Sequence, residues 1–187
     1  MAERLGGGIL LVCTANVCRS PVAELILRQE CEGRGVRGVP IASAGLRATQ
    51  GTGIDRLMAS LLAEEGIQSE GFRSHRLGRE DVEAAGLILT ATAAQRTEVV
   101  KASPRSLSKT FSMRELVFLT GQHQGDGLEP VESVRQSALR ARPYHSVPAR
   151  DMDIDDPTGR SLRTYRSAYR LLRETMESVA ERLASVV

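Results

Sequence analysis

Residues 9–21 constrain the fold and chemistry of this chain more than any other segment. Four consecutive apolar residues, 9–12, predict a short buried strand, and apolar positions at helical spacing follow Pro21. The loop between them begins with Cys13 and ends at Arg19. In a strand, tight loop and helix of this kind, several backbone N–H groups point at one spot near the helix N-terminus. The segment therefore predicts an anion-binding loop at the end of a buried strand.

The residue types in this loop favour phosphate chemistry with a cysteine nucleophile. A cysteine at the edge of an anion-binding loop is stabilised as a thiolate, and an arginine that closes the loop grips an oxyanion with two donors. Phosphoryl transfer depends on such charge neutralisation and positioning. Ser20 is placed to donate a hydrogen bond to the thiolate, and Asn16 tolerates the left-handed conformation of a tight loop. The predicted phosphate-binding loop consists of Thr14, Ala15, Asn16, Val17, Cys18, Arg19 and Ser20.

Short apolar runs alternate with helical segments along the chain. The predicted strands cover residues 9–12, 36–42, 86–90 and 110–111. The predicted helices cover about 21–33, 55–65, a segment ending near 101, 113–119, 131–141 and 162–186. This alternation is typical of an α/β fold in which helices cover both faces of a parallel sheet. Ligands of such sheets bind at the carboxyl ends of the strands, which is where Cys13 is expected.

The whole chain, residues 1–187, is expected to form a single domain, since about 150 residues per domain is usual. Its 41% apolar content is sufficient for a core. Residues 1–8 are expected to be a loose leader. The stretch 121–150, which is polar and contains glycine and proline, is expected to be a connector with one short helix.

Composition and patterning exclude several classes of protein. No basic patch is interleaved with aromatic residues, so nucleic-acid binding is not expected. No stretch approaches the roughly 18 apolar residues of a membrane span, and the apolar run after Arg4 is too short for a signal peptide. The three cysteines do not form a disulfide framework. A reducing, cytoplasmic location is therefore expected, and no pattern indicates an oligomeric state.

Residues 12–21, Val-Cys-Thr-Ala-Asn-Val-Cys-Arg-Ser-Pro, resemble the signature of the low-molecular-weight protein tyrosine phosphatases. The resemblance implies a three-layer α/β fold with a four-stranded parallel sheet and helices on both faces. It implies that Cys13 is the nucleophile, that Arg19 binds phosphate and that Ser20 supports the thiolate. It also implies a phosphocysteine intermediate and no metal or other cofactor.

Three later segments extend the resemblance over nearly the whole chain. A Ser-Ala-Gly motif begins at Ser43, and a Ser-His-Arg motif is centred on His75. In the family the histidine holds the loop asparagine, so Ser43 and His75 are expected to brace Asn16. Asp156 precedes a proline and matches the family's late Asp-Pro, whose aspartate is the general acid. The implied substrate is a phosphorylated protein or a small phosphomonoester.

Asp156 lies in a segment with several carboxylates, which leaves other interpretations open. The segment contains Asp151, Asp153, Asp155 and Asp156. A solvated acidic loop is the simplest alternative. A calcium loop is disfavoured because glycine is not at the required position and no glutamate follows at the twelfth. Pro157 would stiffen the approach of an acid to the phosphate, so Asp156 is the preferred general acid and Asp155 the second choice.

The remaining cysteines and histidines receive minor roles. Cys18 is predicted to form a reversible disulfide with Cys13 that protects the nucleophile from over-oxidation. Cys31 is expected to be buried on the first helix. His123 and His145 have no spaced partners and are expected to be surface residues, and no zinc-binding pattern exists.

Departures from the family pattern leave the substrate open. Ala15 replaces a glycine, and Thr158 stands where the family tyrosine phosphatases usually have an aromatic residue. Residues 90–92, Thr-Ala-Thr, replace a usual Met-Asp, so the wall for a phosphotyrosine ring is reduced. The phosphoarginine phosphatases of the family carry threonine where Val17 stands, which weakly disfavours that substrate.

Three alternatives to a tyrosine phosphatase therefore stay open. The first is a phosphoarginine phosphatase, and the second is an arsenate reductase of the same fold. The thioredoxin-linked form of that reductase needs two further cysteines near the third strand and its helix, and residues 80–100 contain none. The third is a non-catalytic phosphate-binding module, which the intact catalytic set argues against.

Overall fold

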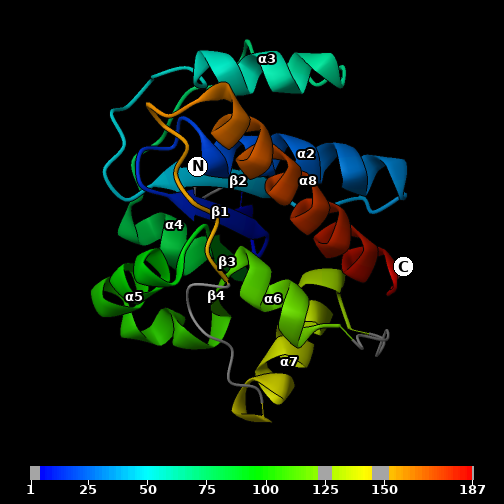
Figure 1. The fold of residues 1–187 in the computed structure, drawn as a ribbon. Helices are drawn as coiled ribbons and strands as arrows, with labels where there is room; N and C mark the ends of the chain where they lie inside the picture. Colours follow the sequence, from blue (N-terminus) through cyan, green and yellow to red (C-terminus); the bar gives the residue numbers. More distant parts are fainter. Residues whose placement is uncertain (1–4, 122–127, 145–151, 187) are drawn as a thin grey trace.

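The computed structural model describes residues 5–121, 128–144 and 152–186. Four parallel strands form one sheet in the order β2-β1-β3-β4. Their bounds are β1 Ile9–Cys13, β2 Ile41–Gly45, β3 Leu87–Thr90 and β4 Thr110–Ser112. Helices flank the sheet on both sides (Figure 1), which confirms the predicted three-layer α/β class.

The helices lie close to their predicted positions, with three short additions. Their bounds are α2 Arg19–Gly33, α3 Arg56–Glu64, α4 Arg79–Ala84, α5 Ala93–Ala102, α6 Met113–Leu119, α7 Pro130–Ala141 and α8 Leu162–Ala184. Two 3-10 helices, η1 and η2, cover Pro104–Lys109 and Arg142–Tyr144. None of α4, η1 and η2 was predicted, because all three are short and α4 is rich in charge.

The second strand begins five residues later than predicted. Residues 36–40 carry the apolar Val36 and Val39, but Gly35 and Gly38 adopt positive φ angles of 75° and 74°. These left-handed glycines turn the chain instead of extending it. Pairing with the central strand starts at Ile41, opposite Ile9.

Alternate residues of β1 supply the two cores. Ile9 and Leu11 point into the larger core, which contains buried residues of α2, α3, α6, α7 and α8. Leu10 and Val12 point into the smaller core with residues of α4 and α5. Figure 1 shows these two groups of helices on opposite sides of the sheet. A strand buried on both faces explains its uninterrupted apolar sequence.

Leu5 and Gly8 are buried while Gly6 and Gly7 are exposed, so the described end of the predicted leader is not loose throughout. Leu5 is fully buried. Gly8 lies so close to β2 that a Cβ there would be 2.1 Å from the Pro40 carbonyl oxygen. The Gly8 carbonyl also accepts a hydrogen bond from the Gly86 N–H at 2.9 Å. Because glycine has no side chain, the backbone here can approach its neighbours closely. Glycine content alone had suggested a loose segment.

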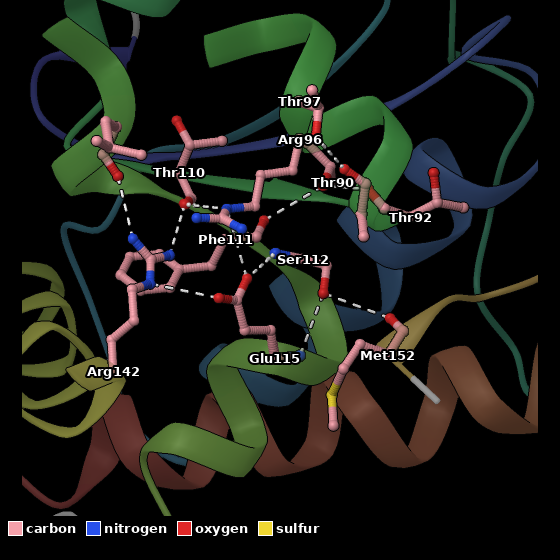
Figure 2. A network of polar contacts seen from close by, with 12 residues as sticks. Thr90, Thr92, Arg96, Thr97, Thr110, Phe111, Ser112, Glu115, Arg142 and Met152 are labelled. Atoms are coloured by element: carbon pink, nitrogen blue, oxygen red, sulfur yellow. Dashed lines mark hydrogen bonds and ion pairs between the residues drawn. The ribbon is translucent and has the colours of Figure 1, made fainter. Parts of the chain in front are cut away.

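The predicted connector contains a well-packed helix, α7, in its described part. Val134 and Ala138 are fully buried in the larger core. Beyond α7, the Arg142 guanidinium stacks on the Phe111 ring at 3.9 Å and pairs with Glu115 (Figure 2). This cation–π contact and ion pair attach the end of the connector to β4 and α6.

Residues 152–156 run over the carboxyl ends of β3 and β4. The Ile154 N–H donates to the Ala91 carbonyl at 2.8 Å, and the Ala93 N–H donates to Asp153 Oδ1 at 2.7 Å. Ser112 Oγ reaches the Met152 carbonyl at 3.4 Å (Figure 2). Asp153 therefore satisfies a free N–H at the start of α5, and the segment is anchored beside the end of β1.

Candidate active site

The loop that follows β1 turns sharply into α2. Cys13 is the last residue of β1, and α2 begins at Arg19. Asn16 has a φ of 53°, the only positive value among the described residues other than glycine. This confirms the left-handed conformation predicted for Asn16, which its short polar side chain tolerates.

Neighbouring backbone N–H groups bind the loop carbonyls. The carbonyls of Cys13 and Thr14 accept hydrogen bonds from the N–H groups of Leu46 and Arg47 at 3.0 and 2.8 Å. In the described part of the chain, the N–H groups of residues 14–18 donate no hydrogen bond. The loop thus presents a series of unpaired donors, as an anion-binding loop does.

Gly45, at the end of β2, lies directly against the loop. A Cβ at this position would be 2.8 Å from the Asn16 nitrogen and 2.8 Å from the Thr14 carbonyl oxygen. Both are backbone atoms, which cannot move without displacing the loop. Glycine is therefore required here by close approach and not by a special φ angle.

The nucleophile candidate, Cys13, receives a hydrogen bond inside the protein. Ser20 Oγ lies 3.0 Å from Cys13 Sγ and donates its proton to the sulfur. The same hydroxyl has a weaker acceptor in the Ala44 carbonyl at 3.3 Å. A donor to the sulfur stabilises the thiolate relative to the thiol.

Asn16 links the loop to two other elements. Its Nδ2 donates to Ser20 Oγ at 2.9 Å and to Ser43 Oγ at 2.8 Å, and its Oδ1 accepts from the backbone N–H of His75 at 2.7 Å. The expected braces are therefore in contact with Asn16. However, the His75 ring does not hold it, because the ring lies 2.8 Å from Asp81 Oδ2. The main chain at position 75, and not imidazole chemistry, provides the brace.

Glu24 completes this network, and sequence reasoning missed it. Ser43 Oγ donates to Glu24 Oε2 at 2.6 Å, so the Ser43 oxygen is left free to accept from Asn16. Glu24 is 7% exposed, and its second oxygen pairs with Arg28 at 2.8 Å. Burial raises the pKa of Glu24 against the opposing effects of Ser43 and Arg28. The available signal was that Glu24 is the one carboxylate in the otherwise apolar stretch 21–27 of α2.

Gln95 holds the outer side of the loop and was also missed. Its Nε2 donates to Thr14 Oγ1 at 3.0 Å. Its Oε1 accepts from the Thr92 N–H at 3.1 Å, while Thr92 Oγ1 caps the Gln95 N–H. Thr92 therefore serves as the N-cap of α5, which explains threonine at the end of the unusual 90–92 segment.

A second brace joins the loop to α3 and α8. The Asp55 N–H donates to the Val17 carbonyl at 2.7 Å, and the Asp55 side chain caps α3. Tyr165 of α8 donates its hydroxyl to Asp55 Oδ2 at 3.2 Å. The position of the loop near Val17 is thus coupled to the packing of α8.

Arg19 connects the loop to the acidic segment. Its Nη2 pairs with Asp156 Oδ2 at 2.5 Å, and its Nη1 donates to the Ile154 carbonyl at 3.1 Å. Its Nε is buried and has no hydrogen-bond partner within the described residues. The side chain is only 4% exposed, so this donor is available to a ligand in the site and to little else.

Asp156 is the carboxylate that the structure brings to the loop. Its side chain is 46% exposed. Burial raises the pKa of Asp156, but hydrogen bonds from the Thr158 hydroxyl and N–H, at 2.7 and 3.1 Å, and the charge of Arg19 lower it overall. Asp155, the second choice, is exposed and is not placed against Arg19. Thr158 therefore donates hydrogen bonds to Asp156, whereas an aromatic residue at this position would pack against a phosphotyrosine ring.

The other two cysteines are buried free thiols. Burial, with smaller effects of Asp156, Asp55 and Cys13, raises the pKa of Cys18 to about 12. Burial also raises the pKa of Cys31 to about 11. The role of Cys18 as redox partner of Cys13 stays a prediction, and its raised pKa implies slow attack on an oxidised nucleophile.

Among the described residues no group of three histidine, cysteine or carboxylate side chains could hold a metal ion. Nor does the same part of the chain contain a helix long and apolar enough to cross a membrane. His123, His145 and Asp151 lie outside the described residues.

Comparison with known proteins gives a consistent answer. The family described as low molecular weight phosphotyrosine protein phosphatase matches residues 8–147. A protein-arginine-phosphatase of Geobacillus stearothermophilus is 30% identical, covering 94% of this chain and 93% of that protein. The low molecular weight protein-tyrosine-phosphatase Wzb of Escherichia coli K12 is 27% identical, covering 94% of each chain. The solved structure of YwlE arginine phosphatase from Geobacillus stearothermophilus has a TM-score of 0.71 at 28% identity, covering 95% of this chain and 92% of that one.

A parallel sheet that ends in a cysteine–arginine loop is the arrangement of a cysteine-based phosphatase, and the family match shows that this protein is one. The chain belongs to the low molecular weight phosphotyrosine protein phosphatase family. The resemblance stated from the sequence is thereby confirmed.

Proposed function

We propose that this enzyme hydrolyses protein-bound phosphotyrosine through a covalent intermediate on Cys13. One observation carries the assignment of roles. Cys13 Sγ, the unpaired N–H groups of the loop and the Arg19 guanidinium are grouped together, and Asp156 lies 2.5 Å from that guanidinium. A nucleophile, an oxyanion site and an acid are the parts that phosphomonoester hydrolysis requires.

In the first step, Cys13 Sγ attacks phosphorus in line with the leaving oxygen. The S–P bond forms as the O–P bond breaks, and Asp156 gives its proton to the departing phenolate oxygen. The N–H groups of residues 14–18 and the Arg19 guanidinium bind the three equatorial oxygens. The orphan Nε of Arg19 supplies one of these donors.

In the second step, water hydrolyses the phosphocysteine. The Asp156 carboxylate accepts a proton from the attacking water, and the S–P bond breaks as the new O–P bond forms. Sulfur leaves as a thiolate, which the hydrogen bond from Ser20 stabilises. Inorganic phosphate is the second product, and no redox partner or cofactor is required.

The pairing of Arg19 with Asp156 describes the enzyme before substrate arrives. A bound phosphate competes for the guanidinium and brings negative charge close to the carboxylate. Both effects favour the protonated form of Asp156, which is the form that acts as general acid. Substrate binding therefore favours the protonated, catalytically competent form of Asp156.

Phosphoarginine is the second candidate substrate. It is favoured by the full-length similarity to the protein-arginine-phosphatase of Geobacillus stearothermophilus. The P–N bond of phosphoarginine also needs a proton on its leaving nitrogen, so the same residues would serve. The cysteine nucleophile works only while reduced, and we propose a cytoplasmic location on that ground.

Turnover of p-nitrophenyl phosphate by the wild type and by the Cys13→Ser and Asp156→Asn variants tests the chemistry. We expect Cys13→Ser to abolish turnover and Asp156→Asn to lower kcat by about 100-fold or more. Equal rates for wild type and Cys13→Ser would refute the mechanism. Peptides that carry phosphotyrosine, phosphoarginine or phosphoserine then identify the substrate, and a higher kcat/KM for phosphoarginine would replace the first candidate with the second.

A further inference from the structure

Three arginines in and just before the first turns of α8 have no ion-pair partner among the described residues. Arg160, Arg163 and Arg166 are exposed and form what we call the arginine strip. Several other arginines pair with a glutamate four positions away in the sequence. Such pairs are Arg28–Glu24, Arg34–Glu30, Arg79–Glu83 and Arg173–Glu177.

The arginine strip lies at the N-terminal end of α8, where the helix dipole disfavours positive charge. The N-terminus of a helix carries a partial positive charge, and the first turn of α8 contains no acidic residue. The residues four positions after Arg163 and Arg166 are Ser167 and Arg170. Like charges at these spacings repel each other. The arginine strip therefore lowers the stability of α8, and no ion pair with the described residues offsets this effect.

The strip lies next to the general acid. The Arg160 N–H donates to the Pro157 carbonyl at 2.9 Å and closes a tight turn directly after Asp156. Arg160 is four positions after Asp156, so their Cα atoms are at most about 14 Å apart. Arg163 and Arg166 line a hollow of about 580 Å³ together with Leu162, Ser167 and Arg170.

Arg170 adds a fourth cation at the far end of this hollow. Its nearest carboxylate is Glu174 at 4.0 Å, the limit of an ion pair. From Arg163 to Arg170 the helix rises by about 10 Å. An extended peptide advances about 3.4 Å per residue, so three or four residues span this part of the hollow.

From this placement we propose that the arginine strip docks an acidic segment that flanks the phosphorylated residue of a protein substrate. The proposal rests on the proposed function and adds the substrate's charge pattern to it. Arginine binds carboxylates with two parallel hydrogen bonds, and unpaired arginines keep those donors available. The acidic residues are expected roughly three to eight positions from the phosphorylated one, as the distances above require.

Kinetics with two phosphotyrosine peptides of equal length test the proposal. One peptide carries acidic residues about three to eight positions from the phosphotyrosine on each side, and the other carries glutamines at the same positions. The Arg163→Glu/Arg166→Glu variant is compared with wild type. We expect its KM for the acidic peptide to rise about tenfold or more, with kcat unchanged, because attraction becomes repulsion. Turnover of the glutamine peptide and of p-nitrophenyl phosphate should stay within about twofold.

The Arg37→Glu/Arg105→Glu variant is the matched control. It changes the net charge equally, and both residues are exposed at the amino ends of β2 and β4, opposite the loop. A similar rise in KM for the control would overturn the proposal, since it would then reflect net charge alone. So would an unchanged KM for the strip variant, once thermal unfolding has shown that it is folded.

Two further measurements separate the possible outcomes. Fluorescence anisotropy of both peptides on Cys13→Ser measures docking without turnover, so docking is tested even if the wild type hydrolyses neither peptide. When the strip substitutions are combined with Cys13→Ser, loss of the preference for the acidic peptide would support the proposal. Binding to phosphatidylserine vesicles that needs the strip, with the peptide preference absent, would assign the strip to a membrane surface and overturn it.

Discussion

Binding of a dianion should make the enzyme take up a proton at Asp156. In the free enzyme the pKa of Asp156 is lowered overall, with Arg19 2.5 Å away. For an oxyanion bound by the Arg19 guanidinium, which pairs with this carboxylate at 2.5 Å, we take a separation of about 5 Å between the two anionic groups. For a half-exposed group, an effective dielectric constant of about 40–80 gives about 0.8–1.7 kcal/mol for each anionic charge. A dianion therefore disfavours the carboxylate by about 2 kcal/mol, which makes protonation about thirtyfold more favourable.

Calorimetric titration with sulfate tests this prediction, because sulfate keeps its charge over the useful pH range. The titration is done at about pH 5 in two buffers of different ionisation enthalpy, and the difference gives the protons taken up. Cys13→Ser is the starting protein, so that protonation of the thiolate does not contribute. We expect uptake of a fraction of a proton per sulfate bound. Uptake should fall towards zero near neutral pH.

The Cys13→Ser/Asp156→Asn variant is the control for this experiment. It should bind sulfate at least as tightly, since Arg19 no longer pairs with a carboxylate, and it should take up no proton. Equal proton uptake by the two proteins would refute the reasoning. The acid would then be prepared by another group, or Arg19 would stay paired with Asp156 when the anion binds.

Three other substitutions test the supports of the loop. Gly45→Ala should lower kcat by about 100-fold, because the new methyl group collides with loop backbone, while Gly53→Ala, which meets nothing within 4 Å, should match wild type in the same p-nitrophenyl phosphate assay. Glu24→Leu should destabilise by about 1–3 kcal/mol in urea unfolding by leaving Ser43 without its acceptor, whereas Glu24→Gln should preserve stability near neutral pH. Burial raises the pKa of Glu24 in the folded state. Its contribution to folding stability is therefore largest below the pKa of the unfolded state and is lost as pH rises through the pKa of the folded state. Glu24→Gln should remove this pH dependence of stability. Ser161→Ala should lower stability by about 1 kcal/mol through loss of the α8 cap.

Local patterns were sufficient to predict most of the fold. Strand β1, the turn at Asn16 and the caps Ser112 and Ser161 are all determined by neighbouring residues. The apolar stripe of α8 likewise repeats over the whole helix. The start of β2 was misplaced because Val36 is buried through a turn and not through a strand, and a short apolar run is the same in both cases.

The supports of the site could be predicted only where the family resemblance supplied them. Glu24 and Gln95 act on the loop from α2 and α5, at distances of 19 residues from Ser43 and 81 from Thr14. Nothing in the local sequence marks such a pairing, since it depends on how the helices pack against the sheet. The resemblance did indicate that His75 braces Asn16, and the structure shows that the backbone N–H of His75 makes this contact while the ring faces Asp81.

The reduced aromatic wall and the arginine strip are best understood together. An aromatic contact to a phosphotyrosine ring contributes about 0.5–1.5 kcal/mol, and Thr158 cannot provide it. Two exposed ion pairs between the strip and an acidic segment contribute about 0.2–1 kcal/mol each, which is the same range. Substrate affinity in this enzyme would then come from charges beside the phosphorylated residue and not from its ring. Rising salt should therefore increase KM for an acidic phosphopeptide far more than KM for p-nitrophenyl phosphate, and a parallel increase of the two would argue that the strip takes no part in substrate binding.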